Sequence, residues 1–131
     1  MKGDDMSTRI LIVDDNPVNL KLATDVLEME GYAVEKAVDA EQAQEMLKSA
    51  TPDLILMDIA LPGMDGLTLM RKLKADERLK DVPVVAMTAF AMKGDEQKAL
   101  AAGCDGYITK PIDTRKLPQQ VAAYLLPHAD K

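Results

Sequence analysis

Five short apolar runs, each followed by a segment with helical spacing, constrain this chain more than any other feature of its sequence. The runs are nearly continuous and contain β-branched residues, which is typical of strands buried on both faces of a sheet. They fall at residues 9–15, 32–37, 52–58, 82–88 and 106–110. Helices are predicted at residues 17–31, 40–50, 67–76, 94–103 and 113–126. This alternation predicts an α/β fold of parallel β-α-β units with right-handed crossovers.

The ends of the predicted helices carry recognisable signals. Pro17 suits the first turn of the first helix, and Gly31 suits the position just after its end. Asp39 is predicted to cap the second helix. Pro118 conflicts with an interior helical position, because proline removes a backbone donor and clashes with the preceding turn. The last helix therefore either begins near Leu117 or bends at Pro118.

Composition excludes several classes of protein. The chain has 131 residues, 47% of them hydrophobic, which fits one globular domain. It contains no run of about 18 apolar residues that could span a membrane, and no signal peptide follows the charged start. A net charge of −6 argues against direct nucleic-acid binding. Cys104 is the single cysteine of the chain, so an internal disulfide is excluded. Its side chain is expected to be a small buried hydrophobic group, in a protein from a reducing compartment. We predict a cytoplasmic domain at residues 9–126, with a flexible N-terminal leader at 1–8 and a tail at 127–131.

Polar residues stand directly at the ends of four predicted strands. The first strand ends in Asp14 and Asp15, the third in Asp58, the fourth in Thr88 and the fifth in Lys110. Ligands of open parallel sheets bind beyond the carboxyl ends of the strands, so we expect these residues to converge. Because burying a charge is costly, Asp58 either lies at the open rim or meets a cation. We expect the rim. One such residue is usually a turn or cap residue, but the joint pattern favours a site.

Three clustered carboxylates predict a divalent metal, because they repel one another unless a cation joins them. Oxygen ligands of this kind suit Mg²⁺, with Mn²⁺ as an alternative. A metal, a carboxylate, a hydroxyl and an ammonium group are the components of in-line phosphoryl transfer onto an aspartate. An aspartate needs no general base for this reaction, because it is already ionised near pH 7.

The segments LIVDDN, LILMDIALPGMDG, VVAMTA and YITKPI resemble the conserved blocks of the receiver domain of two-component response regulators. The resemblance covers residues 9–126 and implies a flavodoxin-like, doubly wound sheet of order 2-1-3-4-5 with five helices on both faces. It implies that Asp58 accepts the phosphoryl group. It also implies that Mg²⁺ is bound by Asp14, Asp15, Asp58 and the backbone carbonyl of Ala60.

The same resemblance assigns the remaining residues of the site. Thr88 is expected to donate its hydroxyl to the phosphoryl group, and Lys110 to pair with a phosphoryl oxygen. Pro111 is expected to follow a cis peptide bond, a feature almost confined to proline. Tyr107 matches the aromatic residue that turns inward when Thr88 moves toward the phosphate. Its position fits a half-buried edge-strand tyrosine equally well.

Two subtypes of receiver are the most similar: a single-domain cell-cycle regulator and the receiver of a hybrid histidine kinase. The expected phosphoryl donor is a histidine kinase or a histidine phosphotransfer protein, docking on residues 18–30. Leu20, Leu22 and Val26 cannot all face inward there, so apolar surface is expected to remain exposed. A downstream protein would bind the face of the fourth helix, fifth strand and fifth helix. The short end PHADK leaves output to this surface, with the chain a monomer or a phosphorylation-linked dimer.

Ala60 and Phe90 are expected to tune the lifetime of the phosphoryl group. They stand two residues beyond Asp58 and Thr88, and their apolar side chains cannot orient an attacking water. We therefore expect slow self-dephosphorylation and no other enzymatic activity. His128 is expected to be an inert residue of the tail, beyond the last helix.

Three other classes share part of this pattern. A haloacid-dehalogenase-type phosphatase would need a second aspartate two positions after its nucleophile, where this chain has Asn16. A flavin-binding module would need a glycine- and hydroxyl-rich phosphate loop, and DDNP stands there instead. A receiver that docks without being phosphorylated stays open as an alternative, although the acids, hydroxyl and lysine are all present.

Overall fold

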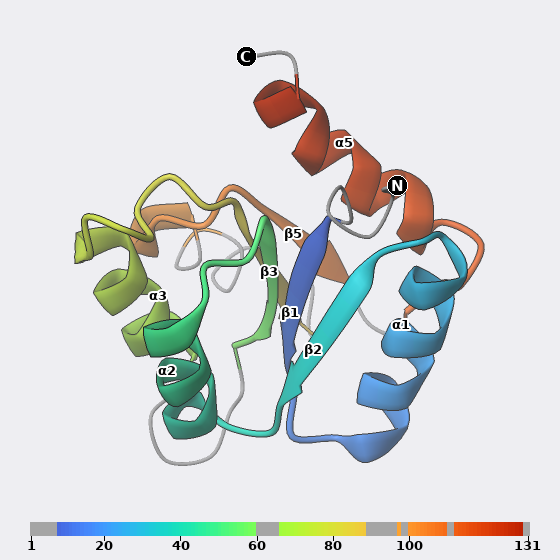
Figure 1. Ribbon diagram of the computed structural model, residues 1–131, viewed down its shortest axis with the longest axis horizontal. Coiled ribbons are helices and arrows are strands. Elements are labelled where there is room, and N and C mark those ends of the chain that lie inside the picture. The colour runs from blue at the N-terminus through green and yellow to red at the C-terminus, as the bar shows by residue number, and fades with distance from the viewer. Residues whose placement is uncertain (1–7, 60–65, 89–96, 98–99, 110–111, 130–131) are drawn as a thin grey trace.

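The strands form one parallel sheet, as the sequence predicts. The computed structural model describes residues 8–59, 66–88, 97, 100–109 and 112–129, without the side chains of residues 88 and 126–129. The strands are β1 (Arg9–Val13), β2 (Ala33–Ala37), β3 (Leu54–Asp58), β4 (Val84–Thr88) and β5 (Gly106–Thr109). Their order is β2-β1-β3-β4-β5, and every neighbouring pair is parallel (Figure 1).

Helices cover both faces of the sheet, which confirms the doubly wound fold. They are α1 (Pro17–Met29), α2 (Ala40–Ser49), α3 (Gly66–Ala75) and α5 (Leu117–Ala129). Helices α1 and α5 lie on one face, and α2 and α3 lie on the other (Figure 1). The predicted fourth helix falls largely outside the described residues, of which 97 and 100–102 are helical. Within the described part of the chain, no helix combines the length and apolar character needed to cross a membrane.

The central strands are buried on both faces, and alternate residues feed two separate cores. One core joins the sheet to α2 and α3, and its strand residues include Leu11, Val13, Ile55 and Met57. The other joins the sheet to α1 and α5, and its strand residues include Ile10, Ile12, Leu54 and Leu56. Since a one-residue slip would exchange the two faces of a strand, this packing fixes the level at which each strand ends.

Helix α1 begins and ends at the residues that the sequence indicates. Pro17 is its first residue, and Gly31 follows its end with a φ of 95°, a conformation that glycine adopts without strain. The N-cap is Asn16, whose Oδ1 accepts hydrogen bonds from the N–H groups of Val18 (2.9 Å) and Asn19 (3.2 Å). Both predicted helix signals are therefore confirmed.

Asp39 caps α2, as predicted. Its Oδ1 accepts a hydrogen bond of 2.7 Å from the N–H of Gln42. The Gln42 side chain reaches back, and its Oε1 accepts a hydrogen bond of 2.7 Å from the N–H of Val38. The two bonds together satisfy two backbone donors at the start of the helix, in a variant of the capping box in which Gln42 bonds the residue before the cap rather than the cap itself.

Helix α5 begins at Leu117, so Pro118 lies in its first turn and the helix need not bend there. The preceding turn is closed by the carbonyl of Asp113, which accepts a hydrogen bond of 2.9 Å from the N–H of Leu117. The predicted end at residue 126 is wrong, because the helix continues to Ala129 and includes position 128. His128 is therefore not in a tail beyond the helix. The prediction ended the helix before the proline at position 127, whereas in the structure this proline lies in the last turn of α5.

Gly66 lets the start of α3 touch the end of β3. A Cβ atom at this position would lie 2.5 Å from the Cα of Ile59 and 2.6 Å from the backbone oxygen of Asp58. The N–H of Gly66 donates a hydrogen bond of 3.1 Å to the carbonyl of Ile59. Because both clashing atoms belong to the backbone, rotation of a side chain cannot relieve the contact. Glycine is thus required where α3 meets the strand end.

Replacing Asp39 with alanine tests the cap of α2. The Asp39→Ala variant loses the acceptor for the Gln42 N–H. We expect its free energy of unfolding to be about 1 kcal/mol lower than that of wild type. Urea denaturation followed by circular dichroism measures this change. Asp39→Asn keeps a side-chain oxygen acceptor and is expected to unfold within about 0.5 kcal/mol of wild type.

Replacing Gly66 with alanine tests the close contact between α3 and β3. We expect Gly66→Ala to lower the free energy of unfolding by about 3 kcal/mol, because overpacking forces backbone movement. Gly31→Ala is the matched control, since a Cβ there meets no atom within 4 Å. That variant should lose only about 1 kcal/mol, from its left-handed backbone. Equal losses in the two variants would contradict the role of the contact.

Candidate functional site

Three acids meet at the carboxyl edge of the sheet. Asp14 directly follows β1, and Asp58 is the last residue of β3. These strands are neighbours in register, with Val13 opposite Met57, so the two aspartates leave the sheet at the same level. Asp15 joins them, and one carboxylate oxygen from each of the three acids lies within 4.8 Å of the others. The predicted convergence of the acids is confirmed.

Backbone hydrogen bonds hold the first of these acids in place. The N–H of Asp14 donates to the carbonyl of Ala37 at the end of β2 (3.0 Å). The Oδ1 of Asp14 accepts from the N–H of Asn16 (2.9 Å). Asn16 also caps α1, so one residue ties the acid to the helix that follows it. No capping role was predicted for Asn16, although an asparagine directly before a proline at a helix start is a capping signal.

Burial differs among the three acids and corrects one expectation. Asp15 is exposed, whereas Asp14 is fully buried and only 5% of Asp58 is exposed. The prediction that Asp58 faces outward at the rim is therefore wrong. Its strand lies between β1 and β4, and α3 begins against its backbone oxygen. Burial of two neighbouring acids makes a compensating cation the better of the two explanations considered for Asp58.

The fourth predicted site residue lies on the adjacent strand. Asp58 is opposite Met87 in the register of β3 and β4, so Thr88 stands one residue beyond the level of Asp58. Its neighbour on β5 is Thr109. The backbone of Thr88 thus lies at the same edge as the acids, while its side chain is outside the described part. The predictions for Ala60, Phe90, Lys110 and Pro111 also fall outside the described residues.

Tyr107 lies on the edge strand of the sheet. It is opposite Ala86 in the register of β4 and β5. Its side chain is half-buried and packs against the core on the side of α2 and α3. This placement confirms a half-buried tyrosine on the edge strand, while its role as a switch residue stays a prediction.

Cys104 lies outside the acid cluster, in the core beneath β4 and α3. Burial is the main reason why the pKa of its thiol is raised above the ordinary value. The thiol is therefore protonated at neutral pH and weakly nucleophilic. The expectation of a small buried hydrophobe agrees with both observations.

The acid cluster provides the ligands that a hard divalent cation prefers. Three carboxylate oxygens at this separation can contact one ion, and one of the three acids, Asp15, is exposed to solvent. Mg²⁺ binds to one or two carboxylates and keeps further positions for water or phosphate oxygens. The residues present therefore fit Mg²⁺, with Asp58 at the carboxyl end of the central strand β3.

Comparisons with known proteins agree with this arrangement. The family model described as the response regulator receiver domain matches residues 10–122. The polar-differentiation response regulator DivK of Brucella ovis is 42% identical over 120 residues, covering 92% of this chain and 98% of that protein. DivK of Brucella anthropi matches to the same extent.

Solved structures show the same fold. A response regulator from Chloroflexus aurantiacus superposes with a TM-score of 0.88 at 29% identity, covering 92% of this chain and 98% of that one. The receiver domain of a sensor histidine kinase from Pseudomonas aeruginosa, solved with a magnesium ion in its active-site cleft, has a TM-score of 0.84 and is 35% identical. The alignment covers 91% of this chain and 98% of that one. The protein described here therefore belongs to the response regulator receiver domain family.

Proposed function

We propose that the protein is a phosphorylation-dependent switch in which Asp58 accepts a phosphoryl group from a phosphohistidine. The observation that carries this proposal is the cluster of Asp14, Asp15 and Asp58, whose oxygens lie within 4.8 Å of one another at the edge of the sheet. Such a cluster is electrostatically unfavourable by itself and suits a metal-assisted reaction with an anionic phosphoryl donor.

The metal would be held by the three carboxylates and by the backbone carbonyl of Ala60. Bound Mg²⁺ supplies positive charge that offsets repulsion between the carboxylates and the phosphoryl oxygens. The magnesium in the histidine kinase receiver from Pseudomonas aeruginosa supports this choice. Mn²⁺ is the alternative with the same oxygen preference.

Each protein group has a separate task. The Asp58 carboxylate attacks phosphorus and displaces the histidine nitrogen of the donor, so a phosphoryl-aspartate forms. Thr88 and Lys110 hold the phosphoryl oxygens by a hydroxyl and an ammonium group. These contacts favour a conformer with Tyr107 turned inward, which alters the face made by the fourth helix, β5 and α5. A downstream protein then binds this face.

The exposed apolar surface of α1 supports docking of the phosphoryl donor. Val18 is 72% exposed and Leu22 is 37% exposed, whereas Leu20 is buried in the core. Val18 and Leu22 line a groove of about 420 Å³ with Pro17. An ion pair between Lys21 and Asp25 (3.0 Å) borders it. An apolar groove on a helix suits the helical bundle of a histidine kinase or a histidine phosphotransfer protein.

Two narrower roles fit the same chemistry. Similarity along 98% of DivK favours a single-domain regulator that acts through protein contacts. Similarity to the receiver of a histidine kinase supports the alternative of a hybrid-kinase receiver. The exposed groove on α1 also fits a receiver that docks without phosphorylation. The docking-only receiver is the second candidate function, and it predicts that binding of the partner protein does not depend on Asp58.

Intact-protein mass spectrometry after incubation with acetyl phosphate tests the proposal. We expect a phosphoryl adduct that requires Mg²⁺, disappears with EDTA and is lost in Asp58→Asn. Asp53→Asn is the matched control, because Asp53 lies just before β3 at the opposite end of the sheet. That variant should be modified like wild type. Absence of an adduct under every condition would favour the docking-only receiver.

The lifetime of the adduct tests the role of Ala60 and Phe90. Since neither side chain can position water, we expect slow loss of the phosphoryl group. The variant Ala60→Asn/Phe90→Gln should shorten the half-life about a hundredfold, at the lower end of the range for a positioned acid or base. The decay of the adduct is followed by mass spectrometry after acetyl phosphate is removed. An unchanged half-life would contradict the assignment.

A further inference from the structure

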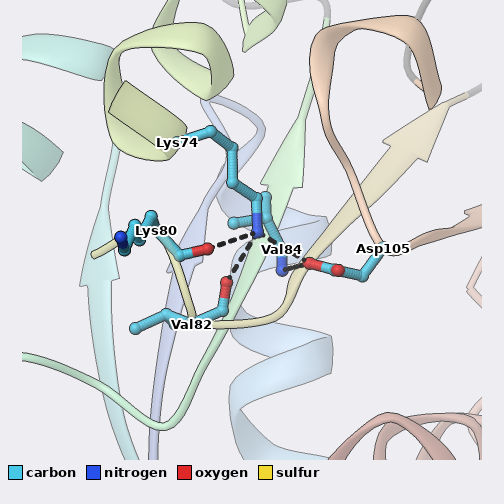
Figure 2. A network of polar contacts seen from close by, with 5 residues as sticks. All are labelled: Lys74, Lys80, Val82, Val84 and Asp105. Carbon is cyan, nitrogen blue, oxygen red and sulfur yellow. Dashed lines mark hydrogen bonds and ion pairs between the residues drawn. The ribbon is translucent and has the colours of Figure 1, made fainter. Parts of the chain in front are cut away.

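A partly exposed cluster of hydrogen bonds, called the joint below, lies at the amino end of the sheet, away from the acid cluster. Its centre is Lys74 in the last turn of α3, whose Nζ donates to three oxygens (Figure 2). These are the carbonyls of Lys80 (3.3 Å) and Val82 (3.0 Å) and the Oδ2 of Asp105 (2.9 Å). All three donors of the ammonium group therefore have acceptors, and 19% of the Lys74 side chain is exposed.

Asp105 connects this joint to Val84, the first residue of β4. Its Oδ2 accepts a hydrogen bond of 2.8 Å from the N–H of Val84. Its own N–H donates to the carbonyl of Val84 at 2.8 Å. Both backbone groups of Val84 are thus bound by one residue, directly before β5 begins at Gly106 (Figure 2).

The stem of Lys74 also packs against the turn before β5. A Cβ atom at Gly103, which has a φ of 112°, would lie 2.9 Å from the Cγ of Lys74. The lysine therefore contacts this turn through its methylene groups as well as its ammonium group. Helix α3, the start of β4 and the start of β5 meet at a single side chain.

This joint has consequences for Tyr107. Strand β5 is an edge strand of only four residues, so few ladder hydrogen bonds fix its register. The pairing of Gly106 with Val85 and of Tyr107 with Ala86 follows directly from the Asp105–Val84 contacts. A slip of one residue would turn Tyr107 to the other face of the sheet.

The joint also has a structural link to the acid cluster. Helix α3 begins at Gly66, against the backbone of Asp58. Lys74 is eight residues later, about 12 Å along the helix axis at 1.5 Å per residue. One short helix therefore contacts the phosphoacceptor strand at one end and the start of the switch strand at the other.

We propose that Lys74 and Asp105 form a positioning pair that sets the register of β5, and so determines how Tyr107 responds to the state of Asp58. The register claim concerns the unmodified protein, whereas the response of Tyr107 rests on the proposed phosphorylation. Lys74 and Asp105 lie at the amino end of the sheet, whereas the three acids lie at its carboxyl edge. Loss of the Lys74–Asp105 pair is therefore expected to change the switch strand without changing metal binding.

Amide hydrogen exchange by NMR tests the register claim. In Lys74→Met, the aliphatic stem remains and the ammonium group is lost. We expect the amides of Val84, Asp105 and β5 to exchange about tenfold faster relative to those of β1 and β3, as in a local opening. Asp105→Asn keeps a side-chain acceptor for Val84 and should show a smaller change in the same amides.

The matched control is Lys48→Met, which removes a lysine from α2. Lys48 pairs with Glu45 at 2.8 Å, and both side chains are at least 70% exposed. This variant should leave the exchange pattern unchanged, because exposed pairs contribute little. Equal acceleration in all strands of Lys74→Met would indicate general destabilisation and overturn the proposal. Unchanged exchange would overturn it as well.

Two further measurements separate positioning from the proposed function. Titration with Mg²⁺ should give the same Kd in Lys74→Met as in wild type, and acetyl phosphate should modify both at similar rates. The chemical-shift change of Tyr107 on phosphorylation should be lost or strongly reduced only in the variant. A full Tyr107 response in the variant would refute its coupling to the pair. Failure of wild type to be phosphorylated would refute the proposed function, while the exchange result would still decide the register claim.

Discussion

Repulsion among three carboxylates is the interaction on which the rest of this structure depends. Two unit charges 4.8 Å apart repel by roughly 3 kcal/mol at an effective dielectric constant near 20. Asp14 and Asp58 nevertheless lie close together and are buried, which requires a rigid structural frame around them. That frame is a pair of parallel strands, β1 and β3, packed on both faces by separate cores. The stability of the cores therefore holds the acids in an arrangement that favours a divalent cation.

The frame also explains why small residues at the strand ends matter as much as charged ones. Asn16 joins Asp14 to the first turn of α1, and Gly66 brings α3 against the carbonyl of Asp58. Both contacts involve backbone groups, so they hold the ends of β1 and β3 against the helices that follow without adding charge. The site is thus built from two helix starts and two strand ends, at the edge where parallel α/β sheets bind ligands.

Much of this arrangement follows from local sequence patterns. The strands, the order of elements and the convergence of Asp14, Asp15 and Asp58 could be predicted, because continuous apolar runs and their final residues are visible in the sequence. The burial of Asp58 could not, since it depends on strands β1 and β4 on either side and on a helix that starts eight residues later. The end of α5 at Ala129 could not be predicted either, because an interior proline removes a backbone donor and clashes with the preceding turn, so the local pattern favours an end before residue 127.

The Lys74–Asp105 contact shows a further limit of local patterns, since 31 residues separate its partners. An edge strand of four residues cannot fix its own register, whereas a central strand is fixed by partners on both sides. The restraint on β5 therefore has to come from outside its ladder, and a side chain from α3 provides it. Because α3 also touches the end of β3, the short edge strand β5 is positioned by the same helix that contacts the strand carrying Asp58. A strand that is loosely held by its own hydrogen bonds can shift at low cost, as the proposed response of Tyr107 requires, and its starting position is nonetheless defined.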